Sequence, residues 1–348
     1  MTSEKRLLML LAEEARGRGW ERGDRFSLTV LDIIKAHNNR LPDIHVLAQR
    51  MDRTFCIVNS ISKRTAAEAA TYALDGVLPD DGTETNVDIA VMTAMQLEAA
   101  AVTLFLEDLS EHVDRIGTIS RRGRLRHSRT HRSVVVVHGD VGNNATAALT
   151  SQLLTTCTPR ILLFVGVAGG LKDAASQGTV VAATDIYDYS ALKEGKRGPA
   201  ARIKTFSTSY ALRRRADVVA HDESWLTLAR TVPQTRTQGS KAPSVLVKPI
   251  VAGPVLLADL ASGTGEWIRA HCDDAVAIEM EGVGFSLATG LHPGLQTLVV
   301  RGISDRVDDK TMSNDERWQP IAAARAAAFA LATADAYLAS PPGGTDER

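Results

Sequence analysis

The sequence is poor in cysteine, in net charge and in long apolar runs, and each shortage excludes a class of protein. Its three cysteines lie far apart in 348 residues, so they form neither a disulfide framework nor the C-x-x-C spacing of a metal site. Forty basic and 41 acidic residues leave a charge of −1, which gives no general attraction to nucleic acid or an anionic membrane. No apolar run approaches the roughly 20 residues of a membrane-spanning helix. We therefore expect a cytoplasmic protein with reduced thiols, no metal, no cofactor and no membrane partner.

Length and composition predict a globular protein of two domains. The chain is 44% apolar and 23% charged, and about 150 residues per domain suits two domains. Apolar residues at helical spacing in residues 1–76 predict a small all-helical adaptor domain. A polar stretch with proline, glycine and acids predicts a linker over 77–86. Residues 87–340 are then the second domain, and the tail 341–348, with its prolines and glycines, is expected to be disordered.

Short runs of valine, isoleucine and leucine alternate with alanine-rich segments throughout the second domain. Continuous apolar runs suit strands buried on both faces. The predicted fold class is therefore α/β, with a central sheet in a three-layer αβα arrangement. The expected strands are 87–91, 134–137, 161–165, 180–181 and 298–300, and the expected helices are 98–109, 145–154 and 321–338.

Residues able to do chemistry follow these strands, where ligands of such sheets bind. The first strand runs into TAMQLE, which ends at Glu98, and the strand 161–165 runs into GVAGG at 166–170. The segment IEMEGVG begins at residue 278 and leads into a helix. The strand 298–300 runs into RGISD, which ends at Asp305.

Taken in order, the segments DIAVMTAMQLEAAAV, HGDVGNNATAA, LLFVGVAGGL, IEMEGVG and VVRGISD resemble the nucleoside phosphorylase/nucleosidase superfamily. The resemblance is strongest to the branch that cleaves methylthioadenosine and S-adenosylhomocysteine, and it covers roughly residues 87–340. It implies the phosphorylase-type αβα fold, a small-molecule purine nucleoside or nucleotide as substrate, and a homo-oligomer.

The resemblance also implies roles for individual residues. Asp305 matches the general acid that protonates the leaving purine, which requires burial to raise the pKa of its carboxyl. Glu281 matches the residue that holds the ribose hydroxyls. The remaining substrate-binding residues are Met280 along the sugar, Arg301 at the attacking group, Ser304 beside the acid, Val167 near the water, and Gly169 and Gly170 where the backbone approaches the ligand.

Glu98 distinguishes hydrolysis from phosphorolysis. Phosphorylases of this superfamily usually place glycine and arginine in the first loop to hold phosphate, whereas nucleosidases place their water-activating base there. This chain has no basic residue between Asp88 and Glu107. Two like charges about 4 Å apart repel by roughly 4 kcal/mol at an effective dielectric of 20, so a carboxylate disfavours a phosphate nucleophile. We expect hydrolysis, with Glu98 as general base and Asp305 as general acid. The alternatives are a phosphate-dependent purine nucleoside phosphorylase and a non-catalytic module that senses nucleotides.

The chain departs from the superfamily pattern near the base and the 5′ group. Val167 stands where nucleosidases commonly have serine, and Leu256 where phenylalanine often stacks on the base. Two basic stretches offer contacts for a nucleotide's phosphates, which simple nucleosides do not need. Their candidate phosphate-binding residues are Arg124, Arg126, Lys196 and Arg197, although a run such as 121–132 is more often a solvated face of a β-hairpin.

Other assignments stay open at this stage. Glu98 could be a solvated acid in the first turn of a helix, Asp305 a helix N-cap, and Glu281 a salt-bridged helix residue. Residues 42–64 fit a helix-turn-helix pattern imperfectly, because Asp52 replaces the preferred turn glycine. We therefore favour a protein-binding or oligomerising role for residues 1–76 over nucleic-acid binding. An adaptor joined to a nucleosidase suits a regulated effector that depletes nucleotides, for instance in antiviral defence.

Overall fold

A computed structural model describes the backbone of residues 25–29, 59–63, 72–77 and 85–339, except 115–116, 129, 197, 237–242 and 310–311. Side chains are described from residue 86 onward, apart from these gaps and residues 309 and 312–315. The chain divides into two compact units, Met1–Thr83 and Glu84–Arg348, which are considered separately below.

The described part of the first unit is an antiparallel sheet of strands β1 (Arg25–Thr29), β3 (Tyr72–Val77) and β2 (Asn59–Lys63), in that order. The prediction of helix is therefore wrong for these three segments. Phe26 and Leu28 alternate with polar residues, a pattern of period two, and short apolar runs do not distinguish helix from strand until pairing is known. The rest of residues 1–76, most of the stretch 42–64 and the tail 341–348 lie outside the described residues.

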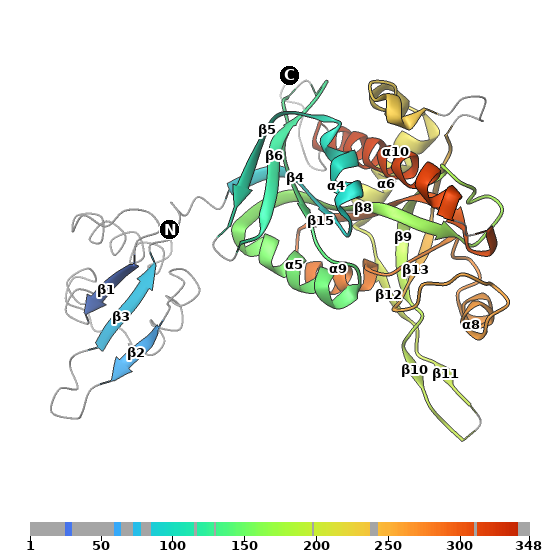
Figure 1. The fold of residues 1–348 in the computed structure, drawn as a ribbon, viewed down its shortest axis with the longest axis horizontal. Helices are drawn as coiled ribbons and strands as arrows, with labels where there is room; N and C mark the ends of the chain where they lie inside the picture. Colours follow the sequence, from blue (N-terminus) through green and yellow to red (C-terminus); the bar gives the residue numbers. More distant parts are fainter. Residues whose placement is uncertain are drawn as a thin grey trace. The chain divides into compact units, whose positions relative to one another are not determined.

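A large sheet, ten-stranded as far as the structure describes it, forms the centre of the second unit (Figure 1). Its strand order is β12-β9-β13-β14-β8-β4-β7-β6-β5, and β15 pairs with both β8 and β9, so five strands close into a ring. A small hairpin, β10 (Leu192–Lys193) with β11 (Ala200–Ala201), projects from the sheet. The strands are β4 (Thr85–Thr93), β5 (Leu106–Val113), β6 (Ile119–Leu125), β7 (Ser133–His138), β8 (Cys157–Gly170), β9 (Val180–Asp188), β12 (Lys204–Ser207), β13 (Val245–Ala252), β14 (Ala277–Glu279) and β15 (Gln296–Arg306).

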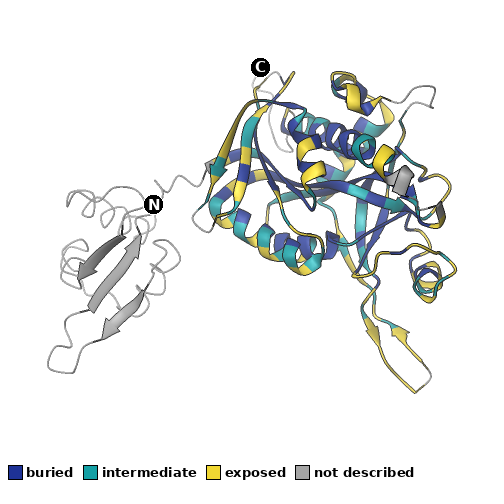
Figure 2. Cartoon of the chain, viewed as in Figure 1, coloured by how far each residue is buried: buried dark blue, intermediate teal, exposed yellow. Residues whose placement is uncertain are grey.

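Helices cover both faces of this sheet, which confirms the predicted three-layer αβα arrangement. One core cluster joins the sheet to α4 (Gln96–Thr103), α6 (Tyr210–His221), α7 (Trp225–Ala229) and α10 (Met312–Ala339). A second cluster joins the other face to α5 (Asn143–Thr156) and α9 (Gly282–Thr289). Figure 2 shows the strands between these layers as buried. Helix α8 (Gly263–His271) packs in a third cluster beside β13, and short 3-10 turns lie at Pro233–Thr235 and Val307–Asp309.

Helix α10 is alanine-rich because it packs very close to the sheet. A Cβ added at Gly302 of β15 would lie 2.0 Å from the carbonyl oxygen of Ala322, so residue 302 has no room for a side chain. Of the helices described, the segment Glu316–Ala339 is alone in being long and apolar enough to cross a membrane, but 72% of its most apolar window is buried. It is therefore accounted for as the core helix of the αβα layers.

One predicted helix is too long. We expected helix over 98–109, but α4 ends at Thr103 and strand β5 begins at Leu106. Pairing with β6, for example Leu106 opposite Leu125, stabilises the strand and overrides the local helical pattern. The arginine-rich segment 121–132 accordingly begins within a β-hairpin.

The register brings the chemistry-bearing segments to one edge of the sheet. Strands β4, β8 and β15 are parallel, with Met92, Phe164 and Val299 at the same level. The segments that follow these residues therefore emerge together. They contain Glu98, the GVAGG run and Asp305.

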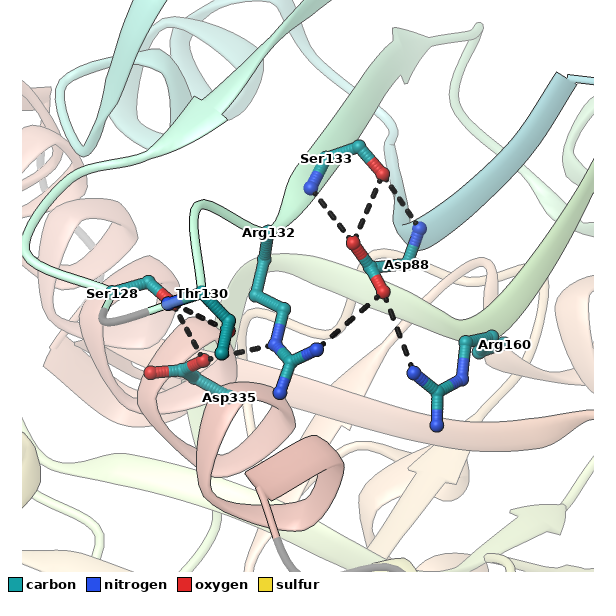
Figure 3. Close-up of polar contacts among 7 residues, drawn as sticks. All are labelled: Asp88, Ser128, Thr130, Arg132, Ser133, Arg160 and Asp335. Atoms are coloured by element: carbon teal, nitrogen blue, oxygen red, sulfur yellow. Dashed lines mark hydrogen bonds and ion pairs between the residues drawn. The ribbon is translucent and has the colours of Figure 1, made fainter.

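The opposite edge is held by a polar network that links the starts of the strands to α10 (Figure 3). Asp88 accepts hydrogen bonds from the backbone and hydroxyl of Ser133, at 3.0 and 3.1 Å. Arg132 lies 3.7 Å from Asp88 and 3.3 Å from Asp335 of α10. Arg160 approaches Asp88 at 3.5 Å. The network ties β4, β7, β8 and α10 together, at the edge opposite Glu98 and Asp305.

Candidate active site

Glu98 points one carboxylate oxygen at its own helix end and the other into the site. Its Oε2 accepts hydrogen bonds from the N–H groups of Ala94 and Met95, at 2.9 and 3.0 Å, as an acid at the third position of a helix commonly does. Its Oε1 accepts the N–H of Val167 at 2.8 Å. The carboxylate is thereby fixed between α4 and β8.

Burial shapes the acidity of Glu98. The side chain is 1% exposed, so the alternative of a solvated first-turn acid does not hold. Burial raises the pKa of this carboxyl, while Arg301 and the three backbone N–H donors partly oppose the rise. A carboxylate with a raised pKa is a stronger base than an exposed one, as a water-activating group requires.

Gly166 allows Glu98 and Arg301 to meet. A Cβ at this position would lie 2.0 Å from Nη1 of Arg301 and 2.5 Å from Oε1 of Glu98. The two charged atoms are thus separated by no more than the sum of these distances. Any side chain at residue 166 would occupy the space that they share.

Arg301 is surrounded by carboxylates. Its side chain is fully buried, and its guanidinium lies 4.1 Å above the ring of Phe164. Nη2 is 2.5 Å from Glu279 and 3.7 Å from Glu281. Burial acts to lower the pKa of Arg301, but the charges of Glu279, Glu281 and Glu98 outweigh burial and raise it. Within the described residues, its Nε and Nη1 have no hydrogen-bond partner.

Glu281 occupies the position just before α9 and faces the same arginine. Its Oε1 accepts the N–H of Gly142 at 2.9 Å, from the turn between β7 and α5. Burial raises the pKa of this carboxyl to about 7; Arg301 opposes the rise, and the charge of Glu279 adds to it. Met280 beside it is half-buried. Glu281 therefore stands at the helix boundary rather than within a helix, and it is poised to change charge near neutral pH.

Asp305 lies in strand β15, so it is not a helix N-cap. It is 4% exposed, and its Oδ1 accepts the hydroxyl of Ser304 at 2.6 Å. A Cβ at Gly169 would lie 3.9 Å from its Oδ2. Gly170 is needed for the turn that follows, because a Cβ there would lie 2.1 Å from the carbonyl oxygen of Ala175.

One segment of β8 connects these groups. Glu98 and Arg301 meet at Gly166, and Asp305 lies against Gly169, about 10 Å further along the extended chain. Glu281 reaches the same arginine from α9. Across the described part of the chain, no group of three His, Cys, Asp or Glu side chains is placed to hold a metal ion. The arrangement can donate and accept protons at two points along one strand.

Two of the four predicted phosphate-binding residues, Arg124 and Arg126, lie away from this site. Arg124 is opposite Ser133, at the start of β7, and pairs with Asp108 on the exposed hairpin. Arg126 donates its Nε hydrogen to the carbonyl oxygen of Leu106 at 2.7 Å. Lys196 is exposed between β10 and β11, and position 197, which is Arg197, lies outside the described residues.

Sequence reasoning missed two residues of the site, Glu279 and Gly166. Both belong to motifs that the sequence showed, IEMEGVG and GVAGG. The first glutamate of Glu-Met-Glu was available as a signal, but only the contact with Arg301 reveals what it does. Gly166 matters because it has no side chain to clash with Glu98 and Arg301, and a single sequence does not show which side chains meet at a glycine.

The fold is that of the nucleoside phosphorylase/nucleosidase type of α/β protein. Residues 88–335 match the family model of the phosphorylase superfamily. The chain belongs to this superfamily, which confirms the resemblance read from the sequence.

Its relatives include nucleosidases. The chain is 29% identical over 225 residues to the ATP nucleosidase Cap17 of Escherichia coli, a match that covers 59% of this chain and 41% of that protein. It thus matches less than half the length of this relative. It is 27% identical over 252 residues to the 5′-methylthioadenosine/S-adenosylhomocysteine nucleosidase of Actinobacillus succinogenes, covering 70% of this chain and 96% of that protein.

Solved structures share the fold. The Helicobacter pylori 5′-methylthioadenosine/S-adenosylhomocysteine nucleosidase, complexed with a pyrrolopyrimidine compound, has a TM-score of 0.58 at 21% identity, covering 72% of this chain and 99% of that one. The futalosine hydrolase of the same organism has a TM-score of 0.57 at 19% identity, covering 71% and 97%. At these identities the likeness concerns the fold.

Proposed function

We propose that this protein is a hydrolase that cleaves the N-glycosidic bond of an adenine-type purine nucleoside or nucleotide. The observation that carries the proposal is the convergence on β8: Glu98 and Arg301 at Gly166, and Asp305 at Gly169. The identity to two kinds of nucleosidase supports the reaction class.

Glu98 is the general base in this proposal. Its Oε1 faces the space at Gly166, where Nη1 of Arg301 is an unused donor among the described residues. A water molecule held by both groups would lose its proton to Glu98 as it attacks the anomeric carbon of the ribose.

Asp305 is the general acid, at the purine end of the site. Protonating the base as the bond breaks lets the purine leave neutral, and Ser304 fixes the carboxyl that does so. Glu281 binds the ribose hydroxyls, and its negative charge favours the oxocarbenium character of the sugar in the transition state. Met280 lies along the sugar.

Water is favoured over phosphate by the charge of the site. One arginine is surrounded by three carboxylates, those of Glu98, Glu279 and Glu281. A phosphate dianion would meet net repulsion there unless several of these groups were protonated. Phosphorolysis is the competing reaction, and omitting phosphate from the assay separates the two.

The 5′ group of the substrate is the least constrained part of the proposal. Cap17 is named for ATP and the second relative for thioether nucleosides. Arg124 and Arg126 lie at the other edge of the sheet, so of the cations considered only those near the β10–β11 hairpin, such as Lys196, remain candidates for a phosphate chain. We propose a nucleotide; much faster adenine release from methylthioadenosine than from ATP, AMP or adenosine would refute that choice.

The decisive experiment measures free base by chromatography in phosphate-free buffer. Glu98→Gln and Asp305→Asn should each reduce base release by about a thousandfold, because each removes one proton-transfer group. The exposed Glu266→Gln and Asp273→Asn are matched controls that should retain full activity. Release only in the presence of phosphate would favour a phosphorylase, and binding without turnover would favour a sensor.

The proposal extends to the oligomeric state of the protein and to the role of residues 1–76. We propose a cytoplasmic homo-oligomer, since superfamily members usually assemble, with residues 1–76 as an adaptor for a protein partner. An adaptor fused to a nucleotide-cleaving enzyme suits a regulated effector, such as one used in antiviral defence. Light scattering of the purified protein tests the oligomer, and a monomer at micromolar concentration would contradict it.

A further inference from the structure

Glu279 has no role in the proton transfers proposed above, but its carboxylate contacts Arg301 and the backbone of Glu281 and Gly282. Its side chain is 1% exposed. Oε2 pairs with Nη2 of Arg301 at 2.5 Å and accepts the N–H of Glu281 at 3.0 Å. The N–H of Gly282 donates to Oε1 at 2.8 Å and to Oε2 at 3.0 Å.

We propose that Glu279 is a positioning residue, which holds Arg301 and Glu281 in one fixed arrangement for the reaction. The inference rests on the proposed function and adds a residue that touches neither the water nor the ribose. It acts through two others, one on β15 and one at the start of α9.

The first part of the role is to direct Arg301. By occupying Nη2, Glu279 leaves Nε and Nη1 as the free donors of the guanidinium, and Nη1 lies at Gly166 beside Glu98. Without this carboxylate, Nη2 would be drawn to Glu281, which is now 3.7 Å away. The guanidinium would then pair with the carboxylate of Glu281, which would no longer be free to bind the ribose hydroxyls. The same movement would turn Nη1 of Arg301 away from the water position.

The second part is to fix the backbone that carries Glu281. The N–H groups of Glu281 and Gly282 are the first donors of α9, and Glu279 satisfies both. Gly282 permits this approach, because a Cβ there would lie 2.5 Å from Oε1 of Glu279. One side chain thus sets the position of both the cation and the sugar-binding acid.

The charge of Glu279 also acts on its neighbours. Glu281 is faced by Glu98 from α4, Arg301 from β15, the N–H of Gly142 and Glu279 itself. Burial raises the pKa of Tyr189, the residue after β9, and the charge of Glu279 adds to the rise. Removing the negative charge of Glu279 would lower the pKa of Glu281, because it removes a repulsion and releases Arg301 to the remaining carboxylates.

The test compares Glu279→Gln, Glu279→Asp and the exposed control Glu266→Gln in the full-length protein. For Glu279→Gln we expect kcat to fall about 30-fold through misplacement of Arg301, and the acid limb of the kcat/KM profile to move to lower pH. Glu279→Asp keeps the charge, so its acid limb should stay near the wild-type position and it should recover part of kcat. Glu266→Gln should match the wild type in every measurement.

Two outcomes separate failure of this inference from failure of the proposed function. If the wild-type protein releases no base from any purine nucleoside or nucleotide, the function itself is wrong. If the wild type is active and Glu279→Gln leaves the acid limb unmoved, the positioning role is overturned, whatever the loss in kcat. Should Glu279→Gln fail to fold, Gly282→Ala displaces the same carboxylate from Arg301. It must then reduce kcat and move the acid limb to lower pH, and a folded Gly282→Ala variant with wild-type kcat and an unmoved acid limb overturns the positioning role.

Discussion

At the scale of single residues, the site depends on residue 166 being glycine, which has no side chain. Gly166 leaves open the volume in which Glu98 and Arg301 approach each other. Replacing it with alanine would place a methyl group on both charged atoms. Because displacing a reacting group by about 1 Å can cost a hundredfold in rate, Gly166→Ala should lower kcat about 100-fold.

Gly263→Ala is the matched control for this change. Nothing lies within 4 Å of a Cβ at Gly263, in the first turn of α8, so activity should be unchanged. Thermal melts of both variants show whether the fold is intact. A fully active, folded Gly166→Ala variant would mean that Arg301 and Glu98 do not share this space during turnover.

The pKa of Glu281 predicts how activity depends on pH. Burial raises the pKa of this carboxyl to about 7. It must be ionised to accept the ribose hydroxyls and to stabilise a cationic sugar, so kcat/KM should rise with pH through about 7. A profile measured from pH 5 to 9 tests this; a flat line between 6 and 8 would contradict an essential ionised Glu281.

Stability should show the opposite trend. A carboxyl whose folded pKa is raised binds more protons in the folded state than in the unfolded one, so its contribution to stability is lost as pH rises through the folded pKa. Buried Glu98 has the same sign. The melting temperature should therefore be higher at pH 6 than at pH 8. This difference should be smaller in the Glu281→Gln variant. An equal difference in that variant would assign the effect to other groups.

Site residues that belong to recognisable sequence motifs could be predicted. Residues whose role depends on a contact with a distant part of the chain could not. Glu98, Glu281 and Asp305 follow predicted strands in recognisable segments, and the structure brings them to one edge. Glu279 has the same residue type as Glu281, but its role depends on Arg301, 22 positions later. Such a pairing follows from sheet register, which a single sequence does not display.

At the scale of secondary-structure elements, the two edges of the sheet have separate tasks. The network in Figure 3 joins the starts of β4, β7 and β8 to α10, and the side chain of Arg132 in it is only 11% exposed. Arg132→Met would leave Asp88 and Asp335 short of a partner. It should lower the free energy of unfolding by about 1–3 kcal/mol and leave KM unchanged.

The exposed ion pair of the β5–β6 hairpin provides the control. Arg124 and Asp108 are more than half exposed, so their ion pair is screened and Arg124→Met should leave unfolding unchanged. Urea titrations of the two variants compare them directly. A change in KM for Arg132→Met would show that the two edges are coupled.

The type of secondary structure could be predicted where apolar runs were long. The prediction was wrong where pairing with another strand determined the structure. The runs 134–137 and 161–165 form buried strands as expected, and the alanine-rich segment 321–338 lies within α10. Residues 106–109 became strand because β6 pairs with them, and Arg25–Thr29 because β3 does. The partner of Leu106 is Leu125, across the hairpin, and the partner of Arg25 is Val77, so in neither place does the pairing show in the pattern of the segment itself.

At the scale of the whole molecule, the chain divides into Met1–Thr83 and Glu84–Arg348, and every residue of the candidate site belongs to the second unit. The superfamily match, residues 88–335, also lies entirely within it. The second unit has its own buried core on both faces of the sheet. We therefore expect truncation to separate the proposed chemistry from the first unit.

A protein that begins at Glu84 should fold by itself and release adenine with a kcat within about threefold of the full chain, because no group proposed for proton transfer is removed. Circular dichroism and the phosphate-free base-release assay measure the two properties, and Asp305→Asn in the truncated protein controls for contaminating nucleosidases. If the truncated protein is folded but inactive, the first unit must supply something that the reaction needs, such as an assembly that completes the site. If it is more active than the full chain, the first unit restrains the enzyme, and adding a purified partner of residues 1–76 to the full chain should then raise its rate to the level of the truncated form.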